Sequence, residues 1–168
     1  MNIQTKIDDT KGRVAYHGDF ALWALEQARL LGEGRFGALD MANLIDEVES
    51  LGRSQRTELR TRLGRLVEHL LKHRHGRMRD PASKWRQTIR EQRRMIHDLV
   101  ADSPSLKPML AEVYESSWKT GVYEALKGFE EYESHNVEAY EREIPEEPDF
   151  SVEQALDEKF LPVPTNDE

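Results

Sequence analysis

The stretch SQRTELRTRLGRLVEHLLKH, residues 54–73, decides the fold because its apolar residues repeat with the period of an α-helix. They recur at i, i+4, i+7, i+8, i+11 and i+12, as Leu59, Leu63, Leu66, Val67, Leu70 and Leu71. This spacing forms one stripe, which is typical of a helix packed on one side only. Ser54 can cap the first turn. We therefore predict a core helix that begins at Ser54.

Two shorter helices are predicted upstream. The first runs from Asp19, a suitable N-cap, to Leu31. The second starts at Asp40 and ends at Gly52, because glycine favours helix termination. Their apolar residues follow helical spacing: Leu22, Trp23, Leu25 and Leu30 in the first helix, and Leu44, Ile45, Val48 and Leu51 in the second. Both helices are expected to pack into a bundle.

Two long helices are predicted downstream, one from Ser83 to Val100 and one from Pro108 to about Glu133. Ser103-Pro104 and Pro108 predict a short turn between them, because proline clashes inside a continuous helix. The last segment contains four prolines and predicts one short helix, Val152 to Asp157, capped by Ser151.

The predicted fold class is all-α. Residues 1–15 are expected to be a flexible N-terminal segment, residues 16–142 a compact antiparallel bundle of four to five helices, and residues 143–168 a Pro-rich acidic segment. The chain has no cysteine, which excludes disulfides and fits a reducing cytosol. We find no signal peptide and no apolar run long enough to span a bilayer, so we expect a soluble cytoplasmic protein.

The charges are segregated along the chain. Residues 53–94 contain 14 Lys or Arg and four Asp or Glu, a net charge of +10, whereas the whole chain carries −8. Residues 124–158 contain 13 acidic residues against Lys127 and Arg142, a net charge of −11. A basic middle of this kind either binds an acidic partner or neutralises the acidic parts of its own chain or of a second copy.

Several ordered motifs are similar to one known family. They are LDMANLIDEVESLGRS (39–54), HLLK (69–72), SKWRQTIREQR (83–93), DSPSLK (102–107) and FLP (160–162). Together they resemble a bacterial all-helical domain of unknown function, DUF family twenty-nine, over about residues 16–162. The resemblance implies a helical fold in a bacterial protein. It implies no activity, because the family carries no established reaction or ligand.

One candidate site is a divalent metal centre. Asp46 and Glu49 share a face of the second predicted helix, and His69 and His73 share a face of the third. Pairs of this kind on facing helices can hold a metal that activates water for hydrolysis. The favoured interpretation is a solvated or salt-bridged surface, since such spacings are common there.

A second candidate is an anion or nucleic-acid surface on the two basic helices. Its residues are Arg62, Arg65, Lys72, Arg86, Arg90, Arg93 and Arg94. Stripes of this kind can follow phosphates along a backbone. The net charge of −8 opposes that function, so neutralisation within the chain or a dimer is favoured.

A third candidate is a polar pocket of Asn43, Ser50, Trp85, Thr88 and Gln92. Gln92 lies among apolar neighbours on its helix and needs partners for its amide. A hydrogen bond that fixes helix register, through Asn43 or Ser50, is favoured over a ligand pocket.

These observations predict a non-enzymatic cytosolic binding or regulatory module that acts through protein–protein contacts, with self-association as a corollary. A metal-dependent hydrolase and a nucleic-acid-binding protein are the alternatives. No phosphate-binding glycine loop and no Ser nucleophile elbow is present in the sequence.

Overall fold

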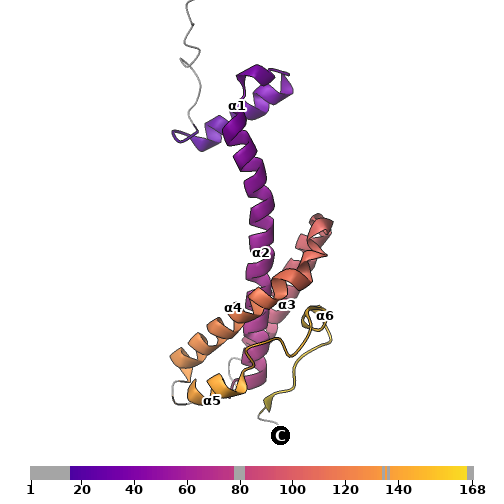
Figure 1. The fold of residues 1–168 in the computed structure, drawn as a ribbon. Coiled ribbons are helices and arrows are strands. Elements are labelled where there is room, and N and C mark those ends of the chain that lie inside the picture. The colour runs from indigo at the N-terminus through magenta and orange to yellow at the C-terminus, as the bar shows by residue number, and fades with distance from the viewer. Residues whose placement is uncertain (1–15, 78–81, 134, 136, 166–168) are drawn as a thin grey trace, which may run out of the picture. The chain divides into compact units, whose positions relative to one another are not determined.

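The computed structural model describes residues 16–77, 82–133, 135 and 137–165. Within these ranges the chain is helical with no strand, which confirms the all-α prediction (Figure 1). The segment predicted to be flexible, residues 1–15, lies outside them. The α-helices are α1 (Phe20–Gly32), α2 (Met41–His75), α3 (Ala82–Asp102), α4 (Met109–Tyr132), α5 (Val137–Glu143) and α6 (Val152–Leu156). Two 3₁₀ turns, η1 (Phe36–Ala38) and η2 (Pro104–Leu106), complete the elements.

The chain divides into two compact units, residues 1–53 and 54–168, which we call the N-terminal and C-terminal units. The sequence predicted a single bundle over residues 16–142. The N-terminal unit contains α1, η1 and the first part of α2. The C-terminal unit contains the rest of α2 and all later elements.

The N-terminal unit has a small core in which polar groups are paired. Trp23 and Leu30 are buried, and the Trp23 Nε1–H donates to Asp40 Oδ2 at 3.2 Å. The Asp40 backbone N–H donates to Gln27 Oε1 at 2.8 Å. These bonds tie α1 to the start of α2. Asp19 caps α1 as predicted, because its carboxylate accepts from the Leu22 backbone N–H at 3.0 Å.

The C-terminal unit contains the main core, and the leucine-rich stripe of α2 lies at its centre. All six stripe residues are fully buried: Leu59, Leu63, Leu66, Val67, Leu70 and Leu71. Helix α4 crosses α2 closely, since a Cβ added to Gly121 would lie 2.6 Å from Val67 Cγ1. The Ser117 hydroxyl of α4 also donates to the Arg60 carbonyl of α2 at 3.1 Å. The prediction of a one-sided core helix is confirmed.

The predicted helix break at Gly52 is wrong, because α2 continues from Met41 to His75. Glycine inside a helix costs only about 1 kcal/mol relative to alanine. Good helix formers flank it, and Glu49 and Arg53 form an i, i+4 ion pair of 3.2 Å across it. Ser54, predicted as an N-cap, is therefore an exposed residue within the helix.

The C-terminal segment packs against the helices of its own unit. Asp149 pairs with Arg74 of α2, and Glu143 pairs with Arg77 at 2.8 Å. The Trp118 Nε1–H of α4 donates to the Pro145 carbonyl at 3.0 Å. The predicted short helix is confirmed as α6, whose N-cap Ser151 forms a capping box with Gln154. The acidic segment thus lies on basic and aromatic residues of the same chain.

Candidate functional site

The four predicted metal ligands are not brought together. The prediction required two facing helices, but all four residues lie on α2. Asp46 and Glu49 belong to the N-terminal unit, and His69 and His73 belong to the C-terminal unit. Across the described ranges, no group of three or more His, Asp or Glu side chains is placed to hold a metal ion. The premise of two facing helices is therefore wrong.

The histidines at the end of α2 are held neutral by their surroundings. His69 Nδ1 lies 3.0 Å from the Arg65 carbonyl, so Nδ1 carries a proton if it makes that hydrogen bond. Burial lowers the pKa of both His69 and His73, and Arg86 lowers the pKa of His73 further. Neutral imidazoles of this kind add no positive charge to the surface around them.

His75 is the most buried histidine among the described residues, with 2% of its surface exposed. Within the described part of the chain, neither of its ring nitrogens has a hydrogen-bond partner. Burial and the nearby Arg74 lower its pKa, while Glu143 and Asp149 oppose that shift. The imidazole acts as a core residue whose protonation the fold disfavours.

We expect the chain to lose stability as the pH falls below 6.5. An unfolded histidine takes up its proton near that value, whereas folded His75 does so at lower pH. The unfolded state then binds more protons, which costs up to about 1.4 kcal/mol per pH unit for each such histidine. Urea unfolding measured at pH 7.5 and at pH 5.5 should show that His75→Phe loses less stability between these two pH values than the native chain does.

Six of the seven basic residues predicted to contact anions are exposed or half-buried. Three have an acid one turn away: Arg62 with Glu58 at 2.6 Å, Lys72 with Glu68 at 2.6 Å, and Arg94 with Asp98 at 3.5 Å. The others, Arg65, Arg86 and Arg90, are exposed. The positive charge of the helices is thus partly neutralised locally.

Arg93, the seventh, is buried, with 2% of its surface exposed. Its Nε–H donates to the Ala155 carbonyl and its Nη2–H donates to the Phe160 carbonyl, both at 2.8 Å. A longer bond of 3.5 Å joins Nη1 to the Glu158 carbonyl. Burial lowers the pKa of the guanidinium, and Asp157 and Glu158 partly offset that shift. Arg93 therefore holds the C-terminal segment on α3 and is not a free anion ligand.

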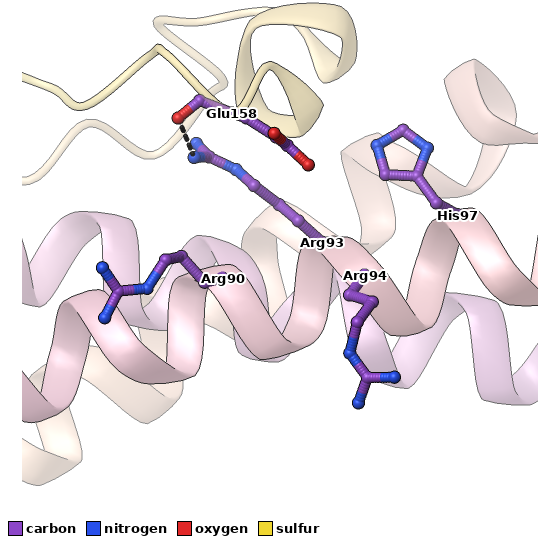
Figure 2. Close-up of a pocket in the computed structure, with 5 residues that line it drawn as sticks. All are labelled: Arg90, Arg93, Arg94, His97 and Glu158. Carbon is purple, nitrogen blue, oxygen red and sulfur yellow. Dashed lines mark hydrogen bonds between the residues drawn. The ribbon is translucent and has the colours of Figure 1, made fainter.

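A hollow of about 630 Å³ lies beside Arg93. It is lined by Arg90, Arg93, Arg94, His97 and Glu158 (Figure 2). Figure 2 shows Arg93 extending toward the Glu158 backbone, while Arg94 points away from that segment. The lining contains three arginines and one glutamate, so the hollow carries a positive charge that Glu158 partly offsets.

The residues of the predicted polar pocket are divided between the two units. Asn43 lies in the N-terminal unit, where its Nδ2 donates to Asp40 Oδ2 at 2.7 Å, and Ser50 is half-buried there. Trp85, Thr88 and Gln92 lie on α3 in the C-terminal unit. Gln92 lines a shallow groove of about 370 Å³ with residues of α2 that include Thr57 and Arg62.

Among its described residues, the N-terminal unit exposes more large apolar side chains than it buries. Its large exposed apolar residues are Phe20, Leu22, Leu25, Leu31, Phe36, Met41, Ile45, Val48 and Leu51. Four of them, spaced i, i+4, i+7 and i+10, form one stripe along α2, which we call the seam: Met41, Ile45, Val48 and Leu51. The sequence predicted that Ile45, Val48 and Leu51 follow helical spacing and pack into the bundle, whereas the structure leaves all three exposed.

Two features escaped sequence reasoning. The buried role of Arg93 was missed, although its alternation with Ile89 and Ile96 on one helix face was a usable signal. The buried Glu133 was missed as well, and its carboxylate accepts a hydrogen bond from the Tyr140 hydroxyl. Arg77 lies 5.0 Å from the centre of the Tyr140 ring. Nothing in the local sequence indicated that Glu133 would be buried.

The helices that the structure describes include none that is long and apolar enough to cross a membrane. No curated protein and no solved structure matches the chain. The model of one protein family matches residues 15–161, which is most of the chain. The chain therefore belongs to the family described as domain of unknown function DUF29.

Proposed function

We propose that this chain is a non-enzymatic cytosolic binding module that acts through protein–protein contacts. The observation that carries the proposal is the seam, where Val48 and Leu51 are 62% and 68% exposed. Contiguous apolar surface of this kind on a folded protein marks an interaction site. The folded chain therefore offers a surface whose burial by another protein is favourable.

The distribution of charge supports the same proposal. The acidic C-terminal segment pairs with Arg74 and Arg77, and its backbone carbonyls accept from Arg93. The basic helices are thus partly covered within one chain, which weakens their attraction for polyanions. In the N-terminal unit, by contrast, nine large apolar side chains remain exposed among the described residues.

A photo-crosslinking experiment tests the proposal. We expect a photoreactive phenylalanine analogue at position 48 to give discrete adducts in cells of the source organism. The same analogue at exposed position 90 on α3 is the control and should give none. The adducts should disappear when Ile45→Asp is added to the crosslinking chain. If position 48 gives no adduct, or the same adducts as position 90, the proposed function is wrong.

A further inference from the structure

The seam is an elongated surface suited to another helix. Met41, Ile45, Val48 and Leu51 lie within about 60° of one line along α2, at 100° per residue. Their exposures of 49%, 50%, 62% and 68% leave on the order of 400 Å² of surface uncovered, comparable to the largest patches on monomeric proteins. The stripe is about 15 Å long, the length of three helical turns.

Gly52 lies on the same face of α2, one turn after Val48. A Cβ added there would meet nothing within 4 Å, so no packing among the described residues requires a glycine. Gly121 of α4 differs, because its added Cβ would lie 2.6 Å from Val67 Cγ1 of α2. Glycine at an exposed helix position costs about 1 kcal/mol relative to alanine. A second helix that approaches α2 closely at the seam would give Gly52 the role that Gly121 has where α4 crosses α2.

The charged residues beside the seam indicate what charge a partner helix should carry along its flanks. Glu47 and Glu49 lie about 100° to either side of Val48, one on each edge, where Glu47 accepts a hydrogen bond from the Tyr16 hydroxyl and Glu49 pairs with Arg53. The described part of the N-terminal unit, residues 16–53, has seven acidic residues and three arginines, a net charge of −4. A second copy paired about Val48 would place Glu47 and Glu49 against the same carboxylates of its partner. That repulsion disfavours self-pairing, whereas Lys or Arg at these edges would be attracted.

We propose that the seam binds an amphipathic helix of another protein, with an apolar stripe flanked by Lys or Arg. This inference rests on the proposed function and names the chemistry of its partner. Apolar contact along Val48 and Leu51 provides the affinity, and Glu47 and Glu49 select for positive flanks. Gly52 lets the two helix backbones approach closely.

Two synthetic 18-residue peptides provide the probes. Both carry the same leucine stripe at a and d positions, and they differ only in having Lys or Glu at the flanks. We expect fluorescence anisotropy at 50 mM NaCl to show the full chain binding the Lys-flanked peptide at least tenfold more tightly than the Glu-flanked one. Val48→Asp should weaken Lys-peptide binding at least tenfold, although it adds negative charge.

The choice of Val48→Asp separates apolar docking from general charge attraction. If attraction to an acidic protein were the whole effect, the added carboxylate would strengthen binding. The pair Glu47→Gln and Glu49→Gln should weaken binding several-fold at 50 mM NaCl and little at 300 mM, because salt screens these charges. Asp98→Asn on α3 is the matched control and should leave binding unchanged. Because Val48 is exposed, Val48→Asp should unfold at nearly the same urea concentration as the native chain.

Three results would overturn the inference. They are equal affinity for the two peptides, unchanged or tighter binding by Val48→Asp, and a dimer in light scattering that Val48→Asp converts to monomer. The third would show that a second copy occupies the seam. It would leave the proposed function standing, because the crosslinks from position 48 would then join two copies of this chain.

Discussion

Replacing Arg93 with alanine is expected to lower the free energy of unfolding by about 2–4 kcal/mol. The guanidinium donates to the carbonyls of Ala155 and Phe160 at 2.8 Å, and it is almost completely buried. Its removal leaves these acceptors without their charged donor and opens a space beneath the C-terminal segment. Urea unfolding at pH 7.5 measures the loss, and hydrogen exchange measures the opening of residues 152–160.

Arg90→Ala is the matched control for this prediction, because Arg90 is exposed one turn earlier on α3. It should change stability by less than about 0.5 kcal/mol. Arg93→Lys should recover only part of the loss, since one ammonium cannot reach the spread of carbonyls that the planar guanidinium reaches. If Arg93→Ala costs no more than Arg90→Ala, the assigned role of Arg93 is contradicted.

The elements of this fold that depend on local chemistry could be predicted from the sequence. Asp19 and Ser151 cap their helices as expected, because a cap needs only a side-chain acceptor near free backbone amides. The α2 stripe is buried as expected, because six apolar residues on one helix face have no other favourable environment. These predictions depend on neighbours within a few residues.

The features that could not be predicted from the sequence depend on contacts between segments that are distant along the chain. The i, i+4, i+7 spacing shows that Met41, Ile45 and Val48 share a face, but not that the chain leaves that face uncovered. Charge likewise does not reveal burial. Arg93 and Arg94 are adjacent in sequence, and only the first meets the carbonyls of residues 155–160. The exposure of these side chains in the structure therefore identifies the candidate surface. Their helical spacing in the sequence had by itself predicted a buried face.

The break predicted at Gly52 shows how a single residue misleads. Glycine is common just after helices, but it ends a helix only when the following residues favour another conformation. Here Arg53 pairs with Glu49 across it, and helix formers continue through Gln55 and Arg56. A glycine inside a helix can also allow a neighbouring helix to approach closely, as the glycines of α2 and α4 illustrate.

A second large effect is expected at the crossing of α2 and α4. Gly121→Ala is expected to lower the free energy of unfolding by about 2–3 kcal/mol, although alanine is the better helix former. The added Cβ would lie 2.7 Å from Val67 Cβ and 2.9 Å from the Glu68 backbone nitrogen. Neither atom can move away by a side-chain rotation, so the two helices must separate around a fully buried core.

Gly52→Ala supplies the control, because its added Cβ meets nothing within 4 Å. It should raise the free energy of unfolding by about 0.5–1 kcal/mol through helix propensity alone. Combining Gly121→Ala with Val67→Ala should cost less than the sum of the two single changes, since removing Val67 Cγ1 relieves its 2.6 Å contact. Chemical unfolding of the four chains against the native one measures these differences. Equal effects at Gly52 and Gly121 would mean that α4 does not cross α2 at Val67, and additive losses would mean that the two positions are not in contact.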